Sequence, residues 1–443
     1  MGSVAACVLT PALASAVTVP PDFVVENAVP GATFDTPTGI AFLPGGRMLV
    51  AEKRGRVYSV SKGVKYPTPM WARESEVLNE SDRGLLGIAV DPGYVSNRFI
   101  YLLYIVDPDS DGVDNNGNGF GRLVRYRVSA TDSNVVDTSS RTTLMGASWT
   151  AGSLSDFPSH SAGSLRWGTD GSLLVSIGEG ASYTGVDPGG LDPTAFGAGK
   201  TDPYEDIGAF RAQYVGSLCG KILRLNPATG RGYASNPYFD GNLSSVRSRV
   251  WAYGLRNPFR FCVRPGSGSA DTAAANPGAL YIGDVGWETW EELDVARSPG
   301  LNFGWPCYEG LSQPSGYQTA SPSHNGCGTM GTPQNPGTYA PPVATWNHWT
   351  ASLSTPPGFI GNCSVGGTFY SGTRYPAPYR GAYFFADYGQ NWIKVATMSA
   401  GDQLVSIQNF AGDLEGPVDL APEPSTGDLY YVSIASNQVR RIR

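Results

Sequence analysis

The stretch HSAGSLRWGTDGSLLVSIGEG, residues 160–180, has the pattern of a β-hairpin. Apolar residues flank a Gly-Thr-Asp-Gly turn, and glycines follow the second strand at Gly178 and Gly180. His160 opens the hairpin and is one of only 3 histidines in the chain. Because glycines let a backbone approach a ligand closely, the stretch predicts a histidine beside a binding site. A solvated loop histidine is the alternative.

Five other stretches repeat this pattern of an apolar strand, a turn with Gly or Pro, and a second apolar strand. The six copies start at Thr38, Leu85, His160, Trp251, Val365 and Pro417. Six copies at irregular spacing predict an all-β fold, a six-bladed β-propeller with long loops on its faces. Two β-sandwiches are the alternative, but they would need a linker near the middle of the chain, and none is evident.

Composition agrees with many short strands, since the 443 residues include 57 glycines and 34 prolines and only 16% are charged. We expect residues 23–443 to form one propeller domain. The last strand, residues 438–443, leaves its blade one strand short, and residues 23–29 could supply the missing strand and cover the open edge. Residues 1–22 are expected to be a signal-like or linker segment, because their apolar run ends in an Ala-Ser-Ala cleavage pattern but lacks basic residues before it.

Charge excludes several classes of partner. The net charge is −7 and the pI about 5.1, with no basic stripe, so nucleic acid is not expected as a partner. No apolar run long enough to span a membrane follows the N-terminus.

Six cysteines without zinc spacing, and Asn-x-Ser sequons at Asn79, Asn242 and Asn362, predict a secreted, extracellular glycoprotein with disulfides.

Two polar insertions, residues 182–213 and 309–350, are too long for ordinary connections and should form the rim of a functional face. Cys307 and Cys327 bracket part of the second insertion, so we expect them to be bonded to each other.

Two motifs between the copies carry polar chemistry. Arg256 and Asn257, in Gly-Leu-Arg-Asn-Pro, offer hydrogen-bond donors at the entry of a strand. The turn at residues 283–288, Gly-Asp-Val-Gly-Trp-Glu, has carbonyls that could bind a hard cation such as Ca²⁺.

The ordered set of the His160 hairpin, GKILRLN at residues 220–226, the Arg256 motif, the residue 283–292 turn and NFGWP at residues 302–306 resembles the glucose/sorbosone dehydrogenase family. The resemblance covers residues 36–443. It implies a soluble quinoprotein that uses pyrroloquinoline quinone (PQQ) on a six-bladed propeller. Cysteine and sequon content is most similar to that of the secreted fungal pyranose dehydrogenases.

The resemblance implies a role for each motif. His160 would be the general base, Arg256 would stabilise charge on the quinone, and Arg256 and Asn257 would contact the cofactor. The carbonyls of Gly286 and Trp287 would hold a Ca²⁺ that also touches the quinone.

Some bacterial relatives hold the carboxylates of the cofactor with cationic side chains in the fifth and sixth copies. This chain differs from them at those positions. The matching stretches, residues 386–389 and 416–419, contain no cations. Lys53, Arg54, Arg374 and Lys394 are the candidates to replace them. Asp82 and Arg83 occupy a position that lies on the sugar side of the site in those relatives, where the residues differ. The resemblance therefore does not imply that glucose is the substrate. The segment Trp-Asn-His-Trp at residues 346–349, which includes His348, could stack on sugar or quinone, or could cap the core.

The resemblance implies a PQQ- and Ca²⁺-dependent dehydrogenase that oxidises a pyranose sugar and passes electrons to an external acceptor. The resemblance implies a cytochrome as that acceptor, on the same polypeptide or separate, and the chain has no C-x-x-C-H haem motif of its own. The alternatives are a non-catalytic extracellular binding protein and a Ca²⁺-dependent propeller lactonase.

Overall fold

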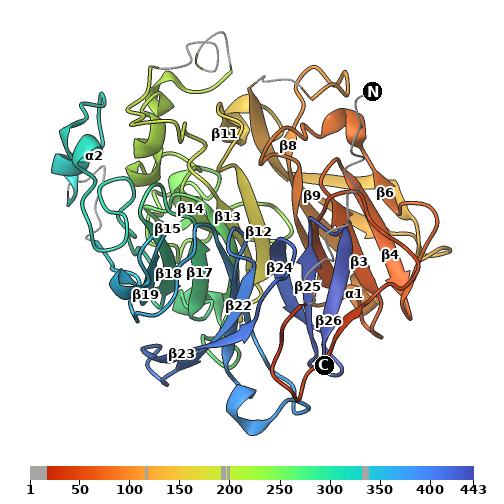
Figure 1. Ribbon diagram of the computed structural model, residues 1–443. Coiled ribbons are helices and arrows are strands. Elements are labelled where there is room, and N and C mark those ends of the chain that lie inside the picture. Colours follow the sequence, from red (N-terminus) through yellow and green to blue (C-terminus); the bar gives the residue numbers. More distant parts are fainter. Residues whose placement is uncertain (1–16, 115–117, 191–195, 197–199, 332–338) are drawn as a thin grey trace, which may run out of the picture.

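The computed structural model describes residues 17–114, 118–190, 196, 200–331 and 339–443. These residues form six antiparallel sheets, four with four strands and two with five (Figure 1). The described chain has only two short α-helices, α1 (Tyr94–Asn97) and α2 (Ser315–Thr319). The fold is the six-bladed β-propeller that the repeats predict.

The strands of each blade follow one another outward from the central channel. Blade 1 contains β2 (Pro37–Phe42), β3 (Met48–Glu52), β4 (Arg56–Ser61), β5 (Val64–Lys65) and β6 (Trp71–Ala72); blade 2 contains β7 (Leu85–Val90), β8 (Phe99–Val106), β9 (Gly119–Val128), β10 (Val136–Met145) and β11 (Ser153–Ser155); blade 3 contains β12 (Ala162–Trp167), β13 (Leu173–Ile177), β14 (Lys221–Leu225) and β15 (Val250–Tyr253). Blade 4 contains β16 (Pro258–Val263), β17 (Leu280–Asp284), β18 (Trp290–Ala296) and β19 (Ala344–Asn347); blade 5 contains β20 (Ser364–Phe369), β21 (Tyr383–Asp387), β22 (Trp392–Met398) and β23 (Leu404–Ala411); blade 6 contains β24 (Pro417–Pro422), β25 (Leu429–Ser433), β26 (Gln438–Ile442) and β1 (Val25–Asn27).

The innermost strands β2, β7, β12, β16, β20 and β24 contact one another in a closed ring. Each of them has a register irregularity near its first residue, for example between Ala162 and Leu165 in β12 and between Pro258 and Arg260 in β16. A bulge bends a strand and redirects its side chains. Six such irregularities therefore surround one end of the channel, where the candidate site lies.

The ring is closed by the N-terminal strand. β1 pairs antiparallel with β26, with Val25 opposite Ile442 and Asn27 opposite Arg440, which confirms the strand predicted within residues 23–29. Before β1, Phe23 is buried among aromatic rings of blade 5. Residues 1–16 lie outside the described residues, so the predicted cleavage pattern does too.

One boundary of the repeats was wrong. The pattern placed Trp251 at the start of the fourth copy, but Trp251 lies in β15, the outermost strand of blade 3, and blade 4 begins at Pro258. The insertion after β13 separates β14 and β15 from their blade in sequence, so the apolar run of β15 was read together with β16.

The long insertions rise together at the top of the view in Figure 1, where α2 and the loops after β13 lie. Cys307 and Cys327 form a disulfide with a Cα–Cα distance of 5.3 Å, as predicted. No helix in the described residues is long and apolar enough to cross a membrane.

Phe23 should be a main anchor of ring closure. Its ring centroid lies 4.8 Å from that of Tyr375, 5.1 Å from that of Tyr379 and 5.0 Å from that of Phe410. We expect Phe23→Ala to lower the free energy of unfolding by about 3–5 kcal/mol, the usual cost of removing a buried phenyl ring. Denaturant unfolding measures this, with Val24→Ala as control because Val24 is 52% exposed. Equal stabilities of the two variants would contradict the anchoring role.

Candidate active site

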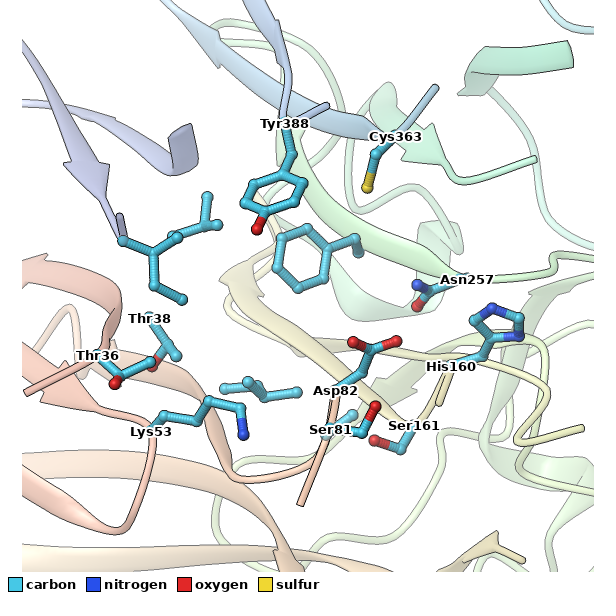
Figure 2. Close-up of a pocket in the computed structure, with 15 residues that line it drawn as sticks. Thr36, Thr38, Lys53, Ser81, Asp82, His160, Ser161, Asn257, Cys363 and Tyr388 are labelled. Atoms are coloured by element: carbon cyan, nitrogen blue, oxygen red, sulfur yellow. The ribbon is translucent and has the colours of Figure 1, made fainter. Parts of the chain in front are cut away.

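A pocket of about 430 Å³ opens at the bulged end of the channel. Figure 2 shows His160, Asn257, Asp82 and Lys53 around it, supplied by different blades and by the loops between them. Its walls combine a few polar groups with apolar side chains, a composition typical of small-molecule sites. The lining residues are Thr36, Thr38, Lys53, Ser81, Asp82, Leu86, His160, Ser161, Ala162, Asn257, Phe259, Cys363, Tyr388, Val418 and Ile434.

His160 lies just before β12 and is only 5% exposed. Its φ of 48° is in the left-handed region, which is uncommon for a residue with a Cβ and is often found at functional sites. Gly178 makes room for this turn, because a Cβ on Gly178 would lie 2.2 Å from the His160 carbonyl oxygen. The backbone of the hairpin mouth therefore holds the imidazole in one place.

Glu179 is the partner of this imidazole. Its Oε1 lies 2.8 Å from Nδ1 of His160, and both side chains are buried. The Nδ1 contact leaves Nε2 as the ring nitrogen available to the pocket. Arg211 fixes the glutamate backbone by donating from Nε to the Glu179 carbonyl oxygen at 3.0 Å, while Glu179 donates its N–H to the Arg256 carbonyl oxygen at 2.9 Å.

Burial decides the protonation of this pair. Desolvation raises the pKa of Glu179 to about 8. Burial, with the nearby charge of Arg256, lowers the pKa of His160 well below its usual value. Below pH 8, Glu179 therefore carries a proton that it donates to Nδ1. Above pH 8, the carboxylate accepts a hydrogen bond from Nδ1–H, and Nε2 has a free lone pair.

Arg256 and Asn257 occupy the turn between blades 3 and 4. Their backbone N–H groups donate to the two carboxylate oxygens of Asp284, at 2.9 Å and 2.7 Å, which fixes the turn. The Arg256 guanidinium donates from Nη1 to the carbonyl oxygens of Gly286, at 2.5 Å, and Val285, at 3.1 Å. The structure thus brings together three of the residues predicted for the site, Arg256, Asn257 and Gly286.

Three buried carboxylates lie directly behind this turn. The side chains of Asp284, Glu292 and Asp294 offer oxygen atoms within 4.8 Å of one another. Burial raises the pKa of Asp284 to about 7 and, with repulsion between the carboxylates, those of Glu292 and Asp294 well above their usual values. Neither carboxylate oxygen of Asp294 has a hydrogen-bond partner among the described residues. These residues could hold a divalent cation, since hard cations favour carboxylate oxygens.

Four predicted cofactor contacts are not among the residues that line the pocket. Arg374 is half exposed, and its Nη1 donates to Asp428 at 2.9 Å. Arg54 is half exposed and pairs with Asp35 at 3.6 Å. Lys394 lies on β22, the third strand from the axis, and donates to Asn409 at 2.5 Å. His348 follows the outermost strand β19, and its Nε2 lies 2.8 Å from Oε1 of Glu291.

Hydrogen bonds also fix Lys53 in the pocket lining and Trp287 in the turn that is predicted to bind metal. Lys53 is the one lysine or arginine among the described residues that line the pocket, and burial lowers its pKa. Its Nζ donates to the carbonyl oxygen and the Oδ1 of Asn79. Trp287 is held by its N–H, which donates to Glu309 at 2.9 Å.

Sequence reasoning missed Glu179. It treated the Gly-Glu-Gly run only as accessible backbone. The available signal was an acidic residue at the end of an apolar strand that pairs with the strand following His160.

Comparison with known proteins identifies the family of this chain. The family model described as Glucose / Sorbosone dehydrogenase matches residues 34–438. HIPL1 protein of Arabidopsis thaliana is 29% identical over 293 residues, which cover 62% of this chain and 35% of that protein. The chain thus matches about a third of the length of this relative.

Solved structures show the same fold. The PQQ-bound aldose sugar dehydrogenase from Streptomyces coelicolor has a TM-score of 0.61 at 20% identity, covering 96% of this chain and 100% of that one. The holo PQQ domain of pyranose dehydrogenase from Coprinopsis cinerea has a TM-score of 0.57 at 14% identity, covering 99% of both. With the family match over nearly the whole described chain, the protein belongs to the glucose/sorbosone dehydrogenase family.

Proposed function

We propose that this protein is a PQQ- and Ca²⁺-dependent dehydrogenase that oxidises a hydroxyl group of a pyranose sugar and passes the electrons to an external acceptor. The observation that carries the proposal is the buried His160–Glu179 pair, whose free ring nitrogen serves the channel pocket. A proton acceptor in a concave, partly apolar site is what hydroxyl oxidation requires.

The pocket residues fit PQQ, a flat tricyclic quinone with three carboxylates. Apolar side chains, among them Phe259 and Val418, provide surfaces for the rings. Two buried donors have no hydrogen-bond partner among the described residues, Ser161 Oγ in the lining and Nε of Arg256, which precedes the lining residue Asn257. A polar ligand would satisfy them. Lys53 supplies a positive charge for a carboxylate. These three kinds of contact are those that the cofactor needs.

Within this site, the chain's own residues bind and move a proton. When bound, PQQ supplies the electrophilic carbon that accepts hydride from the sugar. His160 Nε2 takes the hydroxyl proton, and the Glu179 carboxylate stabilises the imidazolium that forms. Arg256 places positive charge beside the pocket, where negative charge develops on the quinone.

The Ca²⁺ part of the proposal rests on the turn after β17. The carbonyls of Gly286 and Trp287 would hold the ion, after Arg256 gives up its contact to Gly286. The carboxyl groups of Asp284, Glu292 and Asp294, whose raised pKa values keep them largely protonated without metal, would lose protons to a nearby cation and so add negative charge around it.

Secretion and a cytochrome acceptor belong to the same proposal. The Cys307–Cys327 disulfide supports an oxidising compartment. The acceptor is proposed from the family alone.

Reconstitution tests the function directly. We expect the metal-free, cofactor-free protein to reduce a redox dye with a pyranose sugar only after PQQ and Ca²⁺ are both added, and EDTA to abolish the activity. A steady-state dye assay over a panel of aldoses measures this. Calorimetric PQQ binding without dye reduction would favour the binding protein, and hydrolysis of a lactone without PQQ would favour the lactonase.

The pH dependence should report Glu179. The base-competent state requires the Glu179 carboxylate, so kcat/KM should rise as pH increases through about 8. Glu179→Gln can accept the Nδ1 hydrogen at every pH, so the rise should vanish while kcat falls roughly ten- to hundredfold through loss of a charged hydrogen bond. His160→Ala should lower kcat by about 10² to 10⁴. A profile unchanged in Glu179→Gln would contradict this assignment, and Glu74→Gln, on the outer part of blade 1, is the control.

Lys53 should bind a cofactor carboxylate. We expect Lys53→Met to weaken PQQ affinity about ten- to hundredfold, the range for a hydrogen bond to a charged group. Affinity for the PQQ trimethyl ester should change little. Isothermal titration measures both, with the adjacent exposed Arg54→Met as control. Equal losses for PQQ and its ester would contradict a charge contact.

The buried carboxylates make stability depend on pH. Their raised pKa values mean that the folded state holds protons that the unfolded chain releases, so stability should fall as pH rises from about 4 through 7 and beyond. In metal-free protein, Asp294→Asn should weaken this fall and raise the free energy of unfolding at pH 8 by about 1 kcal/mol or more. Thermal unfolding at pH 5 and 8, with and without Ca²⁺, measures this. A Ca²⁺-induced rise in Tm that is the same in both proteins would contradict a role of Asp294 near the cation.

A further inference from the structure

The channel contains a second cavity at the end opposite the candidate active site. It has a volume of about 370 Å³ and is lined by the last residues of all six innermost strands. The active-site pocket is lined by residues at or just before the start of these strands and by residues that follow the second strands of three blades, Lys53, Tyr388 and Ile434. The two cavities therefore share one channel but face opposite sides of the propeller.

Most side chains that line the second cavity are apolar, and the polar ones among the described residues are Thr368, Ser371 and the charged Arg166. Aromatic side chains line it from three blades, Phe42 on β2, Trp167 on β12 and Phe369 on β20. Among the described residues that line it, Arg166 is the one with a charged side chain. Such a chamber suits a ligand with an apolar body and one polar end.

A buried ionic group separates the two cavities. Asp419 on β24 accepts from Nη2 of Arg166 at 3.1 Å through Oδ1, and this oxygen lies 3.7 Å from Nε of Arg260. Its other oxygen accepts the Ile40 N–H at 3.0 Å. Arg260 is 2% exposed and donates to the carbonyl oxygens of Val418, Gly163 and Thr38. Strands of blades 1, 3, 4 and 6 are thus tied together across the axis.

The charges in this group do not cancel. Two guanidinium groups share one carboxylate, so one positive charge is left on the channel axis. Backbone carbonyls occupy Arg260, whereas Arg166 makes two hydrogen bonds in the described structure, to Leu165 and Asp419, out of five possible donors. Arg166 lines the second cavity and its side chain is 23% exposed, so its charge is accessible to a ligand there. A positive charge with low-dielectric walls attracts anions.

We propose that this second cavity is a binding site for a small organic anion with an apolar body, an aryl-substituted carboxylate. The aromatic lining packs against its ring, and the Arg166 guanidinium pairs with its carboxylate. The site is separate from the proposed dehydrogenase chemistry, and its occupancy does not depend on PQQ.

Calorimetric titration with 3-phenylpropionate, and with its neutral amide as reference, tests the site. The acid should bind at least tenfold more tightly than the amide to the wild-type chain. Arg166→Met should abolish that preference, because it removes the cation and leaves Asp419 paired with Arg260. Lys53→Met is the matched control, since it removes the cation of the other cavity, and the preference should persist in it.

Several results of these titrations would overturn the proposal. Equal affinities for acid and amide, or no binding of the acid, would overturn the proposal. Loss of the preference in Lys53→Met but not in Arg166→Met would place the anion in the active-site pocket and also overturn it. If Arg166→Met does not fold, Ala421→Phe fills the cavity while keeping the ionic group intact; acid binding at wild-type affinity would then refute the site.

Discussion

Closure of the ring fixes the relative positions of all six blades. β1 pairs with β26 as the outermost strand of blade 6, so the segment before blade 1 is held against the last blade. The innermost strands of these two blades, β2 and β24, contact each other and close the inner ring. The closed ring removes an open sheet edge, and it also sets the positions from which every functional side chain projects. Phe23 and its aromatic neighbours in blade 5 support this joint just before β1.

The active site places several ionisable groups in a poorly solvated region. Their burial is tolerated because backbone groups compensate for it: Asp284 accepts from the turn that carries Arg256, and Arg211 holds the backbone of Glu179. Burial shifts the pKa of such a group, and its hydrogen bonds keep it in place. The low-dielectric environment makes these groups costly to bury. It also determines whether Glu179 or His160 carries the proton that lies between them.

The two ends of the channel differ in kind although the same strands build both. Bulged strand starts present polar groups such as Asn257 and receive Lys53 and Asp82 from neighbouring loops, whereas the regular strand ends present apolar side chains. The Arg166–Asp419–Arg260 group lies between them and fixes four blades across the axis. The channel is therefore more polar at the end where the strands are bulged and more apolar at the end where the strand pairing is regular.

The blade number, the closing strand and the Cys307–Cys327 pair could be predicted from the sequence, because each depends on local periodicity or on the spacing of residues along the chain. The motifs around His160 and Arg256 are visible in the sequence for the same reason. The sequence pattern misplaced Trp251, since an insertion separated one blade into distant segments. The pairing of Glu179 with His160 and the place of Lys53 in the pocket lining depend on tertiary structure, as does the absence of Arg54, His348, Arg374 and Lys394 from that lining. A propeller brings side chains together across blades, and the distance of a strand from the axis decides which side chains face the channel. No local sequence pattern contains that distance.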